Sequence, residues 1–253
     1  MATCASSKEI VSGDNQSQQP KSKSSCDVIV IGTDEAGRGP GAGGVFASAV
    51  YFNALNDELI EKLSKLNDSK KLSKKAREEL FEIIIKTTIN STVCIEVEEI
   101  ENINILNASL KAMKLACENV IKQISSSDVI ARQKASTPRK ESTETISPQA
   151  DNFLVLVDGN KLIKQFKYPQ EFVIKGDSKS ASIAAASILA KVSRDKYMDE
   201  LDANFPQYNW KKNAGYLTKQ HLAAIDEFGI TPHHRKKFLR KHFAKSAQLE
   251  LTL

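Results

Sequence analysis

The stretch Val28-Ile-Val-Ile-Gly-Thr-Asp-Glu-Ala-Gly-Arg-Gly-Pro40 joins an apolar run to two acids and a glycine-rich segment. The run from Val28 to Ile31 is short and β-branched, which is typical of a buried strand. We therefore expect Asp34 and Glu35 to follow directly after the end of this strand. Acids at the ends of buried strands can converge at one rim of a sheet.

The segment from Gly37 to Gly44, called the glycine-rich loop below, contains one basic residue, Arg38. It includes a Gly-x-Gly-x-x-Gly pattern, which in a dinucleotide-binding fold must open a helix. The residues that follow, 45–52, instead predict a strand, so we interpret the match as accidental. Glycines beside two acids permit the backbone to approach a ligand closely. A plain turn between two strands explains the loop equally well.

Apolar spacing predicts a succession of strands and helices along the rest of the chain. Strands are predicted at 45–52, 89–97, 153–157 and 172–174. Helices are predicted at 73–86, 106–124, 180–201 and 218–228, and a further helix should start at Thr231-Pro232, which resemble a cap and a first-turn proline. Strands at the start and in the middle, with helices between and after them, predict a layered α/β domain with a helical C-terminal part.

Two polar segments, 1–25 and 125–152, predict a disordered tail and a disordered surface insertion. We expect a folded domain over 26–230 and a basic helical extension over 231–253. No window approaches 18 uninterrupted apolar residues, so we expect no membrane span, and the first residues lack the apolar region of a secretory signal. The four cysteines form no Cys-x-x-Cys pair. We interpret them as thiols of a reducing compartment and expect a cytoplasmic protein.

The charge of the chain is concentrated near its C-terminus. The net charge is +5 overall, and residues 205–253 carry nine Lys/Arg and three Asp/Glu, a local +6. The remaining residues therefore sum to −1. A basic segment on a near-neutral body indicates a polyanionic partner, although a solvated helix face would have the same composition.

Four acids stand beside predicted strands: Asp34, Glu35, Asp158 and Asp177. Crowded carboxylates are unfavourable unless cations neutralise them, and hard divalent ions prefer oxygen ligands. Two such ions about 4 Å apart can clamp a phosphoryl displacement. Each acid alone could equally be a helix cap or a loop charge, but their shared position at strand ends favours a metal site.

Six motifs in order resemble ribonuclease HII, a type 2 ribonuclease H. They are Asp34-Glu-Ala-Gly-Arg-Gly-Pro40, Asn67-Asp-Ser-Lys-Lys-Leu-Ser73, Leu156-Val-Asp-Gly159, Lys175-Gly-Asp-Ser178, Ala185-Ala-Ser-Ile-Leu-Ala-Lys-Val192 and Gly215-Tyr216. The resemblance covers roughly residues 27–238 without the insertion. It implies a ribonuclease H-like fold over 26–230, with a mixed central sheet flanked by helices.

The resemblance also implies an activity and its residues. It implies an endonuclease that cleaves RNA–DNA hybrids and single ribonucleotides in duplex DNA with two Mn²⁺ or Mg²⁺ ions, leaving 3′-hydroxyl and 5′-phosphate ends. The implied catalytic and metal-binding residues are Asp34, Glu35, Asp158 and Asp177. The implied substrate-binding residues are Gly37, Arg38 and Gly39, whose main chain would read the ribose 2′-hydroxyl, Lys70 and Lys71 near phosphates, and Tyr216 at the RNA–DNA junction.

Two other functions fit parts of the pattern. A catalytically silent nucleic-acid-binding protein on the same fold would not need four acids beside phosphates. A metal-dependent phosphatase for small molecules would not need the basic C-terminal segment. We therefore expect a nuclease whose partner is nucleic acid. We also expect a monomer with no membrane partner.

Overall fold

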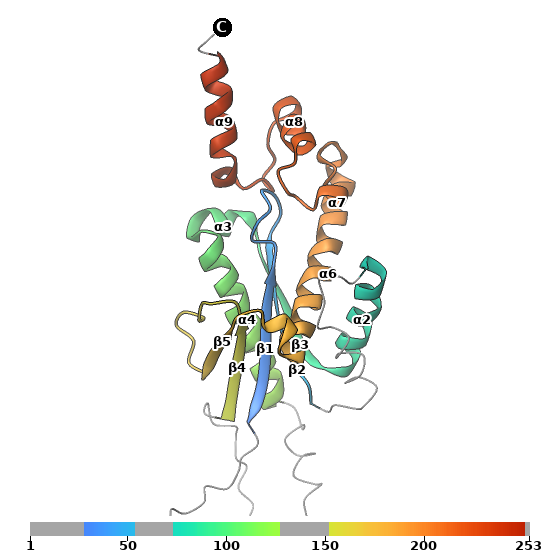
Figure 1. Cartoon of the computed structure of the whole chain (residues 1–253), viewed down its shortest axis with the longest axis vertical. Helices are drawn as coiled ribbons and strands as arrows, with labels where there is room; N and C mark the ends of the chain where they lie inside the picture. Colours follow the sequence, from blue (N-terminus) through green and yellow to red (C-terminus); the bar gives the residue numbers. More distant parts are fainter. Residues whose placement is uncertain (1–27, 54–72, 127–151, 251–253) are drawn as a thin grey trace, which may run out of the picture.

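The computed structural model describes residues 28–53, 73–126 and 152–250. The predicted 1–25 tail, nearly all of the predicted insertion, and Lys70 and Lys71 lie outside the described residues. The centre is a five-stranded sheet in the order β3-β2-β1-β4-β5 (Figure 1). The strands are β1 (Ile29–Ala36), β2 (Val45–Tyr51), β3 (Ile89–Ile95), β4 (Phe153–Asp158) and β5 (Gln170–Val173).

The sheet is mixed, as the resemblance to ribonuclease HII implies. Strands β1, β2 and β3 are antiparallel neighbours, whereas β1, β4 and β5 run parallel. Strand β1 continues to Ala36, so the prediction that Asp34 and Glu35 follow the strand is wrong. Both acids lie inside β1 because β2 pairs with them, Asp34 with Ser48 and Glu35 with Ala47.

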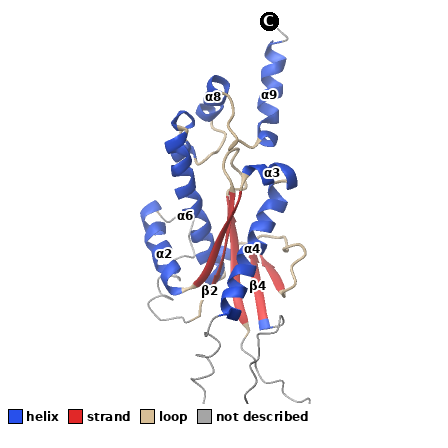
Figure 2. Cartoon of the chain, turned by 180° about the vertical axis from the view of Figure 1, so that it is seen from behind, coloured by secondary structure: helices blue, strands red, loops and turns tan. Residues whose placement is uncertain are grey.

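Helices cover both faces of the sheet (Figures 1 and 2). Helix α4 packs on one face, α6 on the other, and α2 lies against α6. A Cβ on Gly32 of β1 would lie 2.3 Å from the backbone of Ser182. The Ala/Ser-rich composition of α6 therefore serves close packing on the sheet, as predicted. The helices here are α2 (Lys74–Thr87), α3 (Val97–Ile103), α4 (Ile105–Ser126) and α6 (Ala181–Asn204), with the short turn η3 (Gly176–Ser178) before α6.

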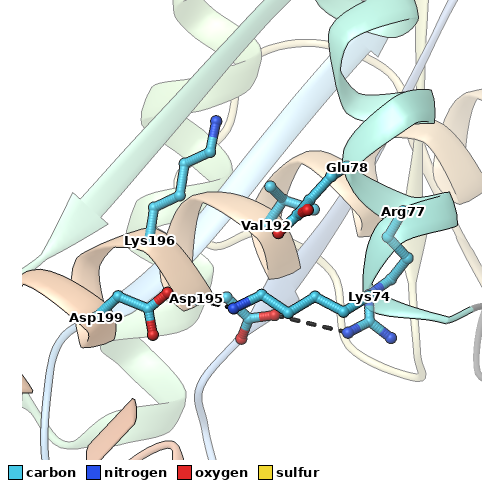
Figure 3. Close-up of a pocket in the computed structure, with 7 residues that line it drawn as sticks. All are labelled: Lys74, Arg77, Glu78, Val192, Asp195, Lys196 and Asp199. Atoms are coloured by element: carbon cyan, nitrogen blue, oxygen red, sulfur yellow. Dashed lines mark hydrogen bonds and ion pairs between the residues drawn. The ribbon is translucent and has the colours of Figure 1, made fainter.

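Ion pairs connect α2 to α6 (Figure 3). Lys74 Nζ lies 3.2 Å from Asp199 Oδ2, and Arg77 Nη2 lies 3.7 Å from Asp195 Oδ2. Ser73, at the predicted start of this helix, caps α2 by accepting the Ala76 amide. These pairs are partly exposed, so each contributes about 0–1 kcal/mol. The apolar contacts of Phe81 with α6 dominate the docking.

The C-terminal elements form a separate small core above the sheet (Figure 1). They are η4 (Pro206–Tyr208), α7 (Trp210–Asn213), α8 (Lys219–Phe228) and the projecting helix α9 (Lys236–Glu250). The prediction that a helix starts at Thr231-Pro232 is wrong, because His234 pairs with Ala42 as a β-bridge and α9 begins only at Lys236. In the described part of the chain, no helix is long and apolar enough to cross a membrane.

A buried histidine pair connects this small core to the loop before α8. The Thr231 amide donates to Nδ1 of His234 (2.9 Å), so neutral His234 carries its proton on Nε2, which lies 3.2 Å from Nε2 of His221. The indole of Trp210 donates to the same His221 atom (3.0 Å), and Nδ1 of His221 lies 2.9 Å from the Tyr216 carbonyl oxygen. Neutral His221 therefore donates from Nδ1 to the Tyr216 backbone and accepts at Nε2, and its protonation would remove that acceptor.

Acid should weaken this network. Burial lowers the pKa of His221, and burial followed by the neighbouring His221 lowers the pKa of His234 to about 4. The unfolded chain takes up these protons first, near pH 6.5, so the histidine contribution is complete above that pH and falls between pH 6.5 and about 4. The stability difference between wild type and His234→Asn should therefore shrink on acidification through this window. Urea unfolding followed by Trp210 fluorescence measures it, and a constant difference would contradict the prediction. Other titrating groups also change the free energy of unfolding with pH. Both proteins share these groups, so their contributions cancel in the difference between wild type and His234→Asn.

Candidate active site

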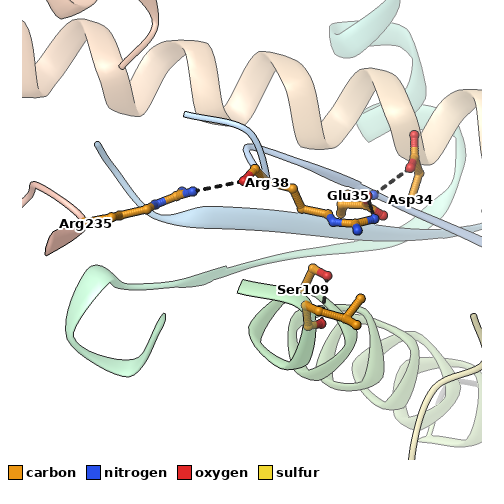
Figure 4. Close-up of polar contacts among 6 residues, drawn as sticks. Asp34, Glu35, Arg38, Ser109 and Arg235 are labelled. Carbon is orange, nitrogen blue, oxygen red and sulfur yellow. Dashed lines mark hydrogen bonds and ion pairs between the residues drawn. The ribbon is translucent and has the colours of Figure 1, made fainter. Parts of the chain in front are cut away.

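Two acids meet where β1 and β4 run side by side. Thr33 is paired with Val157 in the parallel register, so Asp34 and Asp158 occupy the next positions on neighbouring strands. The side chain of Asp34 is nearly buried and points toward α6 (Figure 4). The sequence prediction that these carboxylates converge at one region of the sheet therefore agrees with the register.

Asp34 is held in a strongly perturbed environment. Burial and then the adjacent Glu35 charge raise its pKa to about 7, with a smaller increase from Asp158, while a hydrogen bond from Ser187 and the charge of Lys191 act in the opposite direction. Lys191 Nζ donates to Ser187 Oγ at 2.7 Å. Neither α6 residue was predicted from the sequence, although their spacing of four places them on one helix face.

Glu35 contacts the one arginine of the glycine-rich loop. Arg38 Nη1 lies 3.0 Å from Glu35 Oε1, and the arginine side chain is half exposed. Burial raises the pKa of Glu35, and the Arg38 hydrogen bond and charge oppose that rise. Arg38 lies beside Glu35 (Figure 4) and brings a positive charge to its carboxylate.

Asp158 and Asp177 are linked through the turn η3. The Gly176 amide donates to Asp158 Oδ1 at 2.7 Å, and Asp177 is the next residue. Within the described ranges, no three His, Cys, Asp or Glu side chains lie in an arrangement that could hold an ion. The carboxylates of Glu35 and Asp158 are instead occupied by Arg38 and Gly176.

The glycine-rich loop, which reaches Glu35 through Arg38, lies against Tyr216. Gly37 has a φ of +100°, and a Cβ there would lie 2.3 Å from Nε of Arg194. A Cβ on Gly39 would lie 3.2 Å from Cε1 of Tyr216. Tyr216 is 54% exposed and so is not a core residue. The loop is followed by strand β2, which confirms that the dinucleotide-like pattern is accidental.

The basic segment is only partly available to a ligand. Arg235 is fully buried, and Lys237 donates to the Glu101 carbonyl oxygen of α3. Arg235, one of the nine basic residues of this segment, is therefore not available to a polyanionic partner. The side chains of Lys211, Lys212, Lys219, Lys236, Arg240 and Lys241 are exposed.

Comparison with known proteins gives one consistent result. Residues 31–246 match the ribonuclease HII family model. The chain is 44% identical over 210 residues to "Ribonuclease HII" of Rickettsia canadensis, which covers 83% of this chain and 89% of the relative. It is 46% identical to "Ribonuclease HII" of Pelagibacter ubique, again over 210 residues, with 83% of this chain and 95% of the relative covered.

Solved structures share the fold. The ribonuclease HII in the PCNA complex from Archaeoglobus fulgidus superposes with a TM-score of 0.57 at 23% identity, covering 82% of this chain and 94% of that one. Ribonuclease H2 from Pyrococcus horikoshii gives the same TM-score and identity, covering 83% and 93%. These neighbours confirm the predicted ribonuclease H-like α/β fold. The family match and the curated relatives, each spanning most of the chain, show that this protein belongs to the ribonuclease HII family.

Proposed function

We propose that this endoribonuclease, which cleaves RNA in RNA–DNA hybrids, also cuts at single ribonucleotides embedded in duplex DNA and uses two Mg²⁺ or Mn²⁺ ions. The observation that carries the proposal is the position of Asp34 and Asp158 on neighbouring parallel strands, with Glu35 beside them. The glycine-rich loop contacts Glu35 through Arg38, and the exposed Tyr216 lies beside Gly39 of the same loop. A nuclease that selects ribonucleotides needs both parts, a charged catalytic centre and a surface that recognises ribose.

The chemistry of these side chains fits hard divalent ions, and their described positions must adjust to bind one. Asp34, Glu35 and Asp158 offer only oxygen donors. Burial and repulsion from the neighbouring carboxylates raise the pKa of Asp34, and a bound cation would stabilise its charged form. These three acids would hold one ion, and Asp177 would complete a second site. Bound there, the ions would polarise the scissile phosphate and neutralise the developing charge.

The chain's own groups prepare these ligands. Ser187, held by Lys191, orients the Asp34 carboxylate. Arg38 occupies Glu35 Oε1 in the described state, so Glu35 must exchange this partner before it binds an ion. Gly37 and Gly39 carry no side chain of their own, so the loop backbone can approach a ribose closely. Its amide and carbonyl groups can then hydrogen-bond the 2′-hydroxyl, the group that distinguishes RNA from DNA.

One assay tests the activity. End-labelled duplex DNA carrying a single ribonucleotide is incubated with the protein and Mn²⁺ or Mg²⁺. We expect one cut at the ribonucleotide, with 3′-hydroxyl and 5′-phosphate ends, and no product with EDTA. An all-DNA duplex is the matched control. No cleavage of the embedded ribonucleotide, in a preparation that cleaves an RNA–DNA hybrid, would refute the proposed extension of the substrate range.

We further propose that the protein acts as a cytoplasmic monomer.

Hybrid binding should depend on salt through the exposed basic side chains. Each neutralised phosphate contributes about −0.9 to the slope of log affinity against log salt for B-form duplexes. Replacing Lys211 and Lys212, both exposed on α7, with Gln should flatten the slope by about 1 to 2. Lys122→Gln, on the sheet-covering helix α4, is the control and should leave the slope unchanged. A slope near zero for the wild type would show that the basic segment is only a solvated face.

A further inference from the structure

Arg235 is a buried arginine whose side chain enters the glycine-rich loop. Its Nε and Nη2 donate to the Gly43 carbonyl oxygen at 2.8 and 2.6 Å, and Nη2 also donates to Gly44 at 3.0 Å. Nη1 donates to the Pro40 carbonyl oxygen at 2.8 Å and lies 3.5 Å from that of Arg38 (Figure 4). All of these acceptors are backbone atoms of one loop.

The loop has few side chains of its own with which to hold its shape. Residues 39–44 are Gly-Pro-Gly-Ala-Gly-Gly, so they carry almost no side chains that could pack into a core. Glycine-rich backbone loses more conformational freedom on ordering than any other kind. Donors from outside the loop must therefore fix it, and the guanidinium fork of Arg235 reaches several carbonyls at once in a way that a lysine cannot.

A second buried arginine joins the loop to the segment that carries Tyr216. Arg194 Nη2 of α6 donates to the carbonyl oxygens of Ala42 (3.2 Å) and Ala214 (3.0 Å). The Gly41 amide donates to the Gly215 carbonyl oxygen at 2.9 Å. The loop and Tyr216 therefore share one set of supports, and movement of the loop changes the contact between Gly39 and the tyrosine ring.

The burial of this cation is costly. Burial and then the charge of Arg194 lower the pKa of Arg235 to about 10, which leaves it charged at neutral pH. A buried charge is unfavourable unless hydrogen bonds compensate it, and apolar replacements of buried ions are often as stable. Apolar side chains would be enough to pack a loop against a core. A buried guanidinium is needed where several backbone carbonyl groups must be held in one defined conformation.

We infer that Arg235 is a positioning residue, which holds the glycine-rich loop in the conformation that presents Gly37 and Gly39 to the ribose and sets their distance from Tyr216. This inference rests on the proposed cleavage at embedded ribonucleotides. Arg235 does not touch the substrate. It acts through the loop backbone, so its loss should reduce turnover and substrate discrimination more than affinity.

The test compares Arg235→Lys with two control variants of the full chain. Arg240→Lys makes the same change at an exposed position of α9, and Ile124→Val lowers stability in the core between α4 and the sheet, away from the loop. Emission from Trp210, the single tryptophan, and the melting temperature report whether each variant is folded. Hydrogen–deuterium exchange of the Gly41 and Gly43 amides, which donate to Gly215 and His233, reports the loop directly.

Arg235→Lys should speed exchange at these two amides and lower kcat on an embedded ribonucleotide about tenfold or more, the equivalent of one or two lost hydrogen bonds. KM should stay within about threefold, because the exposed basic surface is unchanged, and the ratio of kcat/KM between the embedded ribonucleotide and the all-RNA hybrid should change. Both controls should keep wild-type kcat, ratio and loop exchange.

Three results would overturn the inference. They are unchanged loop exchange in folded Arg235→Lys, faster exchange with unchanged kcat and ratio, or an equal loss of kcat in Ile124→Val at matched stability. If Arg235→Lys does not fold, Arg235→Gln, which keeps one donor group, replaces it under the same criteria. The exchange measurement needs no substrate. A wild type inactive on embedded ribonucleotides would therefore refute the proposed function, whereas unchanged loop exchange would refute the positioning role alone.

Discussion

Asp158→Asn should abolish turnover while RNA–DNA hybrid binding persists. The asparagine keeps an oxygen that can accept the Gly176 amide now bonded to Asp158 Oδ1, so the local backbone should be retained. What disappears is the negative charge needed to hold a divalent ion. Loss of several kcal/mol of transition-state stabilisation corresponds to a decrease in kcat of about 10³-fold or more.

The measurement is kcat on a labelled hybrid together with the dissociation constant in a metal-free binding assay. Asp202→Asn is a matched control, because Asp202 Oδ1 also accepts a backbone amide, that of Lys211, at 3.1 Å. The control should retain wild-type kcat. Activity of Asp158→Asn within about tenfold of the wild type would remove Asp158 from the ion-binding group.

The strands and the large helices could be predicted because their signals are local. The helices predicted to start at Ser73 and Thr218 begin there, with both residues as caps, and Gly229 ends α8. The end of β1 could not be predicted from the acids themselves, since Asp34 and Glu35 are strand residues only because β2 pairs with them. The helix predicted to start at Thr231-Pro232 does not form there, because of contacts with a distant part of the chain. Thr231 instead bonds His234, whose backbone is held by Ala42.

In the candidate site, too, residues with a local sequence signal could be predicted, whereas residues defined by nonlocal contacts could not. Strand-end position and motif order pointed to the acids and to Tyr216, and the register brings Asp34 and Asp158 together. Their supports were not predictable. In the sequence Arg235 is one of nine basic residues near the C-terminus, and only the folded chain shows that it is buried against loop carbonyls 190 or more positions away. Ser187 and Lys191 are likewise distinguished from their neighbours on α6 only by the presence of Asp34.

Tyr216→Ala should reduce cleavage at a single embedded ribonucleotide much more than Tyr216→Phe. The ring is half exposed beside Gly39, where it can pack on the sugar next to the ribonucleotide, and its hydroxyl can bond the ribose. Loss of the hydroxyl alone should cost about 0.5–1.5 kcal/mol, up to roughly tenfold in kcat/KM. Loss of the ring removes the packing as well.

The two substrates should separate the roles of the ring. On an all-RNA strand paired with DNA no deoxyribose follows the cut, so the response to Tyr216→Ala should differ from that on the embedded ribonucleotide. The measured quantity is the ratio of kcat/KM for the two substrates in each variant. An unchanged rate and ratio in Tyr216→Ala would place the recognition of the junction elsewhere.

Gly39→Ala provides an independent test of the same contact. Its new Cβ would lie 3.2 Å from Tyr216 Cε1, close enough that the ring must move by a few tenths of an ångström. If Gly39→Ala acts by displacing the ring, it should have little further effect once the ring is gone. The double variant should then match Tyr216→Ala, because neighbouring residues that share one contact are not additive. Full additivity on the embedded ribonucleotide would instead show that Gly39 acts through its own backbone, independently of the tyrosine.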